Sequence, residues 1–369
     1  MDSMQVFDLA VPGVRELEPY QPGKPIEELE REYGVTHAIK LASNENPLGP
    51  SAQAVSAARA ALSDIHRYPD GNGFALKTAL ARKLGVTPES ITLGNGSSDI
   101  LEFLARAFVQ PENEVVFSEH AFALYPIVTR AVGAKPVVTN ARDWGHDLAA
   151  MQTAVNARTR LVFIANPNNP TGTWIKAREL ESFMQAMPGH VLVAIDEAYF
   201  EYVPAPEYPN TIGWGMRFPN LVTTRTFSKA YGLAGLRVGY GVSSPAIADI
   251  LNRVRPPFNV NSVALAAATA ALDADAHLAD VVQTNQKGMG QLTGAFTKLG
   301  LKFIPSVGNF VCVDCGRPAA PVYERLLREG IIVRPLANYG MPNHLRVTVG
   351  LPEENERFIK ALEKVIREA

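Results

Sequence analysis

Four groups of polar residues with chemical potential each follow a short apolar run in the sequence. They are, in chain order, Gly94-Asn95-Gly96-Ser97-Ser98, the loop Asn166 to Gly172, Asp196 and Lys229. In open parallel α/β sheets, ligands bind beyond the carboxyl ends of the strands. We therefore expect a phosphate-sized cradle, an amide, a carboxylate and a lysine to converge at one edge of a sheet.

Each group also has an ordinary structural interpretation. The glycine- and serine-rich run can bind an anion through backbone N–H groups at a helix start, or can simply be a tight strand–helix turn. Its spacing is neither the dinucleotide fingerprint nor a P-loop. The proline-containing loop is certainly a turn, and it can also hold an amide over a ligand.

The charged residues can likewise be interpreted as structural or as functional. Asp196 closes the apolar run Val191–Ile195, so its carboxylate is expected to be buried and must face a structural cation or a cationic ligand nitrogen. Lys229 is either a solvated surface lysine or a nucleophile whose pKa is lowered by burial and by Arg237. Arg334 and Arg346 are either surface ion pairs or a site for an anionic substrate.

These side chains depend on a regular alternation of strands and helices. The predicted strands are Ile91–Leu93, Val115–Ser118, Pro136–Thr139, Leu161–Ala165, Val191–Ile195, Leu221–Thr226 and Leu236–Val242. Helical patterns fill most gaps between them, which predicts an α/β fold with a mostly parallel seven-stranded sheet sandwiched by helices. After about residue 245 the pattern changes to a smaller α+β domain. We expect an N-terminal arm over 1–50, a large domain over 51–255 and a small domain over 256–369.

Composition excludes several classes of protein. The 369 residues contain 35 Lys and Arg against 37 Asp and Glu, a formal net charge of −2, which argues against partners such as nucleic acid or a membrane surface. Two cysteines, Cys312 and Cys315, rule out a disulfide scaffold and are expected to be strand residues. The seven histidines show no metal-ligand spacing. With no apolar signal region near Met1 and no membrane-spanning run, a cytoplasmic protein is expected.

Three motifs in order make a specific resemblance. They are Asn166-Pro-Asn-Asn-Pro-Thr-Gly, Asp196-Glu-Ala-Tyr199 and Thr226-Phe-Ser-Lys-Ala-Tyr-Gly-Leu-Ala-Gly-Leu-Arg237. The chain resembles the fold-type I, pyridoxal-phosphate-dependent aminotransferases, and within them the histidinol-phosphate aminotransferases. The similarity runs from Leu41-Ala-Ser-Asn-Glu-Asn-Pro to Leu345-Arg-Val-Thr-Val-Gly, nearly the whole chain.

The resemblance implies a role for each matching residue. Lys229 would bind the cofactor covalently and then carry the proton at the substrate carbon, while Asp196 would pair with the ring nitrogen. The other cofactor-binding residues would be Asn169 and Tyr199 at the ring's 3′ oxygen, Phe122 stacked on the ring, and Gly96, Ser97, Ser98, Thr226, Ser228 and Arg237 around the phosphate. Tyr68 would reach that phosphate from the neighbouring subunit of a homodimer. Tyr20, Asn46, Arg334 and Arg346 would bind the substrate.

The resemblance implies transamination between L-histidinol phosphate and 2-oxoglutarate in histidine biosynthesis. Because Arg346 also stands where relatives bind an amino-acid carboxylate, an aromatic amino-acid aminotransferase is the alternative. A decarboxylase on the same scaffold and a non-enzymatic binding protein are weaker alternatives, and the second conflicts with the presence of both Lys229 and Asp196.

Overall fold

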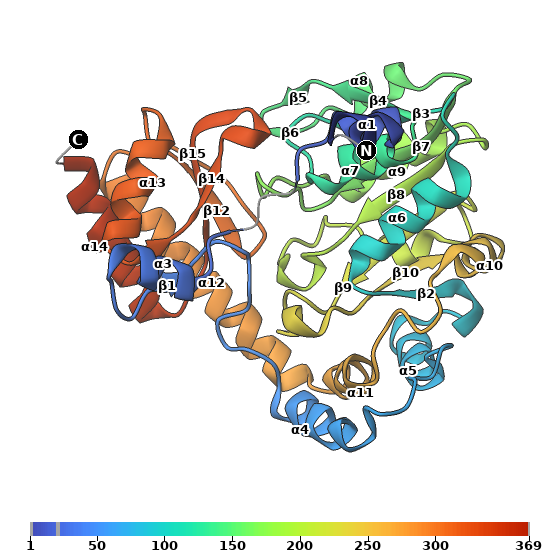
Figure 1. Ribbon diagram of the computed structural model, residues 1–369, viewed down its shortest axis with the longest axis horizontal. Helices are drawn as coiled ribbons and strands as arrows, with labels where there is room; N and C mark the ends of the chain where they lie inside the picture. The colour runs from blue at the N-terminus through green and yellow to red at the C-terminus, as the bar shows by residue number, and fades with distance from the viewer. Residues whose placement is uncertain (1–2, 20–22, 368–369) are drawn as a thin grey trace.

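The computed structural model describes residues 3–19 and 23–367, and its central element is a seven-stranded sheet (Figure 1). In spatial order its strands are β2 (Ile91–Gly94), β10 (Gly239–Ser243), β9 (Leu221–Thr226), β8 (Leu192–Asp196), β7 (Thr159–Ala165), β3 (Glu114–Ser118) and β4 (Lys135–Thr139). β10 runs antiparallel to both of its neighbours, and the other neighbouring pairs are parallel. The predicted fold class and the seven strands are confirmed.

Helices cover both faces of this sheet, which explains why its strands are apolar along most of their length. α6 (Ser97–Phe108), α7 (Leu124–Ala131) and α10 (Pro245–Val254) form one core with β3 and β7. α8 (Leu148–Ala154) and α9 (Ala177–Ala186) form a second core on the opposite face.

A third core lies at the β2–β10 end of the sheet. It contains α4 (Ala52–Ala61), α5 (Phe74–Leu84) and α11 (Ser262–Ala271). Local sequence signals define two of these helices, since the Ser51 hydroxyl accepts the N–H of Ala54 at the start of α4 and Gly85 ends α5 at φ 68°. α11 lies beyond residue 255 yet packs in this core, and the division of the chain at residues 50 and 255 stays a prediction.

The C-terminal part forms a smaller sheet backed by helices. Its strands, in spatial order, are β11 (Phe303–Ile304), β12 (Phe310–Asp314), β15 (Met341–Thr348) and β14 (Arg334–Leu336), all antiparallel. The helices are α12 (Asp275–Lys298), α13 (Ala319–Arg328) and α14 (Pro352–Arg367). α14 buries Phe358, Ala361, Leu362 and Val365, the spacing of one helix face.

The N-terminal segment lies on both parts of the molecule. α1 (Ser3–Leu9) and α2 (Pro12–Arg15) lie near the large sheet, with α2 against α7, whereas α3 (Ile26–Tyr33) lies beside the small sheet (Figure 1). β1 (Ile39–Lys40) pairs with β13 (Ile331–Ile332), and a short hairpin joins β5 (Ala141–Arg142) to β6 (Gly145–His146). Within the described ranges, no helix has both the length and the apolar character that a bilayer crossing requires.

Candidate active site

The predicted strand-end groups meet in one pocket of about 200 Å³ at the carboxyl edge of the large sheet, facing β14 and β15. Twelve of the sequence-predicted residues line it, namely Ser97, Ser98, Phe122, Asn169, Asp196, Tyr199, Thr226, Ser228, Lys229, Arg237, Arg334 and Arg346. The first ten come from the strands of the large sheet and from the helices and loops that follow them, and the two arginines come from β14 and β15. The pocket therefore lies between the two sheets and is completed by both.

The glycine- and serine-rich turn forms a cradle at the N-terminus of α6. Gly96 precedes the helix at φ 79°, and a Cβ atom there would lie 2.5 Å from Arg237 Nη2. A Cβ atom on Gly239 would lie 2.3 Å from the backbone nitrogen of Ser97. Arg237 also donates to the Ser228 hydroxyl over 3.3 Å. Backbone donors, a helix N-terminus and a guanidinium thus surround a space suited to a phosphate.

The carboxylate of Asp196 lies at the end of β8 and is only 6% exposed. Its hydrogen-bond donors are hydroxyls, Thr224 Oγ1 at 2.9 Å and Tyr125 Oη at 3.4 Å. Burial raises the pKa of Asp196 to about 6, although both hydroxyls oppose that shift. A carboxylate buried in this way can hold a cationic ligand atom.

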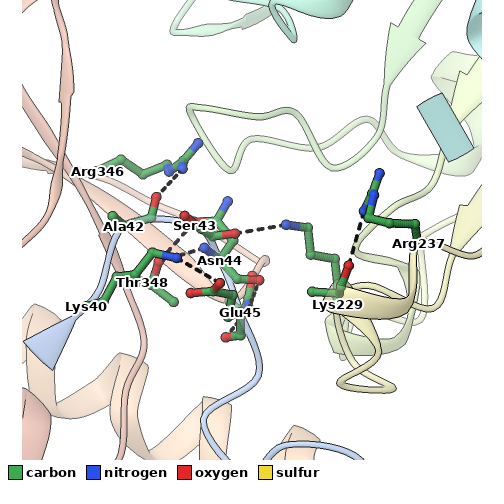
Figure 2. Close-up of polar contacts among 11 residues, drawn as sticks. Lys40, Ala42, Ser43, Asn44, Glu45, Lys229, Arg237, Arg346 and Thr348 are labelled. Carbon is green, nitrogen blue, oxygen red and sulfur yellow. Dashed lines mark hydrogen bonds and ion pairs between the residues drawn. The ribbon is translucent and has the colours of Figure 1, made fainter. Parts of the chain in front are cut away.

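The amine of Lys229 extends from the end of β9 across the pocket (Figure 2). Its Nζ donates to the backbone carbonyl of Ser43 over 3.0 Å. Burial, together with the positive charges of Arg346 and Arg237, lowers the pKa of Lys229 to about 7. A large fraction of this amine is therefore neutral near pH 7, as a nucleophile requires.

Tyr199 and Asn169 each contact a residue from the other part of the molecule. Tyr199 Oη accepts a hydrogen bond from Asn44 Nδ2 over 2.9 Å, and Arg346 Nη1 donates to Asn169 Oδ1 over 2.5 Å. Arg346 Nη2 donates to Ala42 O over 2.6 Å. Burial raises the pKa of Tyr199 to about 12, against the lowering effects of Arg346 and the Asn44 hydrogen bond. Tyr199 is therefore a protonated phenol in this setting.

Tyr68 and Asn46, two of the predicted residues in the described part of the chain, lie outside the pocket lining. Tyr68 is 83% exposed and stacks on Phe258 with ring centroids 4.7 Å apart. The Asn46 amide donates to Gly49 O and Ala230 O, both at 3.0 Å, and it is not among the described residues that line the pocket. Tyr20 lies outside the described residues.

Sequence reasoning missed several contributors to the site. Ala42, Ser43 and Asn44 line the pocket, and Thr224 bonds Asp196 from the neighbouring strand. The run Leu41-Ala-Ser-Asn-Glu-Asn-Pro carried a signal, but only Asn46 was selected from it. Thr224 gave no signal, because a threonine inside an apolar strand is typical of any sheet.

Comparison with known proteins identifies the family. The sequence matches the model for aminotransferases of classes I and II over residues 36–362. The chain belongs to this aminotransferase family. This confirms the resemblance described above and the expectation of an enzyme that transfers amino groups.

Curated relatives of this aminotransferase match along nearly their whole length. It is 62% identical to histidinol-phosphate aminotransferase 1 of Nitrosococcus oceani over 362 residues, which cover 98% of each chain. It is 60% identical to histidinol-phosphate aminotransferase 2 of Pseudomonas fluorescens over 363 residues, again with 98% of each chain covered.

A solved structure has the same architecture. The crystal structure of histidinol-phosphate aminotransferase from Sinorhizobium meliloti in complex with pyridoxal-5'-phosphate is 33% identical, with a TM-score of 0.91. The match covers 99% of this aminotransferase and 100% of that chain. The two chains therefore share one fold over nearly their full length.

Proposed function

We propose that this aminotransferase uses pyridoxal 5′-phosphate to transfer an amino group between L-histidinol phosphate and 2-oxoglutarate, as a step of histidine biosynthesis. The observation that carries the proposal is the pocket in which Lys229, Asp196 and the anion cradle face Arg334 and Arg346. The names of the two curated relatives, at 62% and 60% identity, support the same activity.

The residues of the pocket are suited to this cofactor. The cradle leaves no room for a side chain at Gly96 or Gly239 and presents N–H donors and Arg237, which suits a phosphate group. Asp196 is a buried carboxylate held by two hydroxyls, which suits a cationic ring nitrogen. Lys229 carries an amine with a pKa near 7, which suits bonding to an aldehyde carbon.

When bound, pyridoxal phosphate supplies an aldehyde that can accept an amino group and a ring that withdraws electrons from the substrate carbon. Lys229 Nζ would hold that aldehyde until substrate arrives. As a neutral amine beside the ligand space, Lys229 Nζ would also serve as the base that takes the proton from the substrate carbon. Asp196 would keep the ring nitrogen positively charged, which strengthens its electron withdrawal.

Other side chains would position the cofactor and exclude water. Phe122 lines the pocket and packs edge-on against Tyr125, with ring centroids 5.9 Å apart, so it can cover one face of a flat ring. Asn169 and Tyr199 would donate to the ring's 3′ oxygen. Thr226 and Ser228 extend the phosphate cradle with hydroxyl donors.

The substrate assignment depends on charge. Arg334 and Arg346 face each other across β14 and β15, and they are 8% and 6% exposed. Two neighbouring buried guanidiniums repel each other, so a ligand with two negative charges stabilises the pair. Histidinol phosphate ends in a phosphate dianion, whereas an aromatic amino acid presents a single carboxylate. The arginine pair therefore favours the phosphorylated substrate.

A substrate screen tests this proposal. Purified enzyme loaded with pyridoxal phosphate is given glutamate as donor, with imidazole-acetol phosphate, phenylpyruvate or oxaloacetate as acceptor. We expect the highest kcat/KM with imidazole-acetol phosphate. Efficient turnover of phenylpyruvate without turnover of the phosphorylated acceptor would assign the enzyme to aromatic amino acids. Carbon dioxide release from a phosphorylated amino acid would instead indicate a decarboxylase.

We further propose a homodimer with shared active sites, in which Tyr68 contacts the cofactor phosphate of the neighbouring subunit. Support comes from exposed apolar side chains, namely Phe258, on which Tyr68 stacks, and Leu62, Ile65 and Phe74, which are near Tyr68 in sequence. The cytoplasm is the proposed compartment, and the two free cysteines, both buried, agree with a reducing environment.

A further inference from the structure

The Tyr199 hydroxyl is bonded to a side chain from the irregular segment that follows β1. Asn44 follows β1 in sequence, and its Nδ2 donates to Tyr199 Oη over 2.9 Å. Asn44 is 1% exposed and Tyr199 is 3% exposed, so bulk water does not compete for this bond. The phenol therefore has its acceptor position filled by a fixed amide.

Thr348, near the end of β15, determines which way that amide points. Its Oγ1 donates to Asn44 Oδ1 over 3.1 Å and accepts the backbone N–H of Asn44 over 2.9 Å. A reversed amide would take away the Oδ1 acceptor of the Thr348 hydroxyl proton and would turn Oδ1 towards Tyr199. The threonine hydroxyl thus favours the orientation in which Nδ2 meets the phenol.

The backbone of Asn44 is held as firmly as its side chain. Asn44 has φ 55°, a left-handed conformation that asparagine tolerates better than most residues. Asn309 Nδ2 donates to Asn44 O over 2.9 Å. Figure 2 shows Asn44 beside Thr348, on the same segment as Ser43. The three asparagine and threonine side chains form a fixed support behind Tyr199.

A phenol that accepts one hydrogen bond has its single proton free to donate in another direction. Tyr199 lines the pocket, so that direction includes the ligand space. We propose that Asn44 and Thr348 are positioning residues that orient Tyr199 as a hydrogen-bond donor to the 3′ oxygen of bound pyridoxal phosphate. This inference rests on the proposed function.

The consequence is measurable without turnover. A donor at the 3′ oxygen stabilises the form of the bound cofactor in which that oxygen carries the most negative charge. Removing the donor, or turning its proton away, therefore moves the pH midpoint of the visible absorption of the holoenzyme upwards. We expect Tyr199→Phe to raise this midpoint by about one pKa unit, the size of one ordinary hydrogen bond.

The test compares absorbance titrations of holoenzyme variants. Thr348→Val removes only the hydroxyl and is expected to raise the midpoint in the same direction, whereas Thr348→Ser keeps the wild-type value. The double variant with Tyr199→Phe is expected to have the midpoint of Tyr199→Phe alone, because Thr348 acts through the phenol. Thr297→Val is the matched control, since the Thr297 hydroxyl is exposed and donates to Thr293 O within α12.

A second variant, Asn44→Asp, tests the same inference if the Thr348→Val protein does not fold. Asn44→Asp keeps the size of the side chain but offers the phenol a carboxylate acceptor, so the Tyr199 proton turns away and the midpoint rises. Wild-type midpoints in Thr348→Val and Asn44→Asp, or equal shifts with and without the Tyr199 hydroxyl, would overturn the inference. A wild-type enzyme that forms no visible band and no borohydride-stable adduct at Lys229 would overturn the proposed function instead.

Discussion

Lys229 illustrates how surroundings set the reactivity of one side chain. A solvated lysine is protonated at neutral pH, but burial and the charges of Arg346 and Arg237 lower the pKa of Lys229 to about 7. The same residue type, placed on the surface, would be almost entirely protonated at that pH and would react only slowly with an aldehyde. Reactivity is therefore a property of the pocket as much as of the residue.

The first prediction concerns that amine directly. We expect Lys229→Ala to bind pyridoxal phosphate without a covalent link and to lose nearly all turnover, because the same Nζ holds the aldehyde and moves the proton. Borohydride reduction followed by mass spectrometry should find an adduct at residue 229 in the wild type and none in the variant. A turnover rate close to wild type in Lys229→Ala would remove Lys229 from the mechanism.

The second prediction concerns pH. Since the lowered pKa leaves Lys229 protonated below about pH 7, covalent capture of pyridoxal phosphate by the apoprotein should slow about tenfold per unit below that value and level off above it. Stopped-flow absorbance measures this rate. Arg346→Gln removes one of the charges that lower the pKa of Lys229, so its profile should shift to higher pH. Non-covalent binding to Lys229→Ala controls for titration of the cofactor itself.

The third prediction concerns the two buried arginines. A charge-assisted hydrogen bond contributes about 1.5–3 kcal/mol, so Arg334→Gln and Arg346→Gln should each raise KM for histidinol phosphate by about 10- to 100-fold. Histidinol, which lacks the phosphate, is the comparison substrate and should lose little. Equal losses for both substrates would show that the arginines do not bind the phosphate.

At the scale of elements, the cradle depends on the close approach of β10 to the start of α6. Gly239 is the first residue of β10, and the space beside it is filled by the backbone of Ser97 and Gly96. No side chain can occupy that position without moving the first turn of α6. The backbone N–H groups of the cradle are thus placed by strand packing and not by the loop alone.

The fourth prediction follows from this contact. Gly239→Ala should weaken pyridoxal phosphate binding by more than about tenfold, since a displaced N–H group loses a charge-assisted hydrogen bond. Equilibrium dialysis gives the dissociation constant. Gly235→Ala is the matched control, because a Cβ atom there meets nothing within 4 Å. Equal affinities in the two variants would mean that the cradle tolerates the shift.

Most elements could be predicted from the sequence, because buried parallel strands are continuous apolar runs and helices have capped, periodic patterns. The antiparallel direction of β10 was not predicted, since an apolar run carries no information on direction. The short strands β1 and β13 were missed because two residues give no periodicity.

The site was predictable where a polar residue follows a strand, as with Asp196 and Lys229. It was not predictable where a residue reaches the pocket from another part of the chain. Asn44 is 155 positions from Tyr199 in sequence, and only the tertiary fold brings them together. Thr224 and Tyr125 donate hydrogen bonds to the Asp196 carboxylate. Neither was predictable, because one lies inside a strand and the other inside a helix, with no sequence signal that sets them apart.

At the scale of the whole molecule, residues from the parts around both sheets line the pocket. The proposed dimer would add a residue from the neighbouring subunit, Tyr68. Tyr68 and its exposed apolar neighbours lie outside the pocket of their own chain. In a two-fold dimer the same surface meets itself, so one tyrosine would serve each site.

The fifth prediction tests this sharing. Lys229→Ala and Tyr68→Ala subunits, each poorly active alone, should regain about a quarter of wild-type activity after unfolding and remixing. In the mixed dimer one site has its own lysine and the tyrosine of the other subunit. Size-exclusion chromatography with light scattering confirms that dimers have formed. Recovery no greater than the sum of the separate variants would show that Tyr68 does not serve the neighbouring site.

The reversed direction of β10 has a mechanical consequence. Because β9 leads out to the ligand edge and β10 leads back from it, Lys229 and Arg237 sit on the two arms of a single hairpin turn. The amine proposed to bind the cofactor's aldehyde and the guanidinium proposed to bind its phosphate are thus only eight positions apart in the chain. A tilt of this turn would move Lys229 and Arg237 together. A bound ligand could therefore change its orientation in the pocket while it keeps its contacts at both ends.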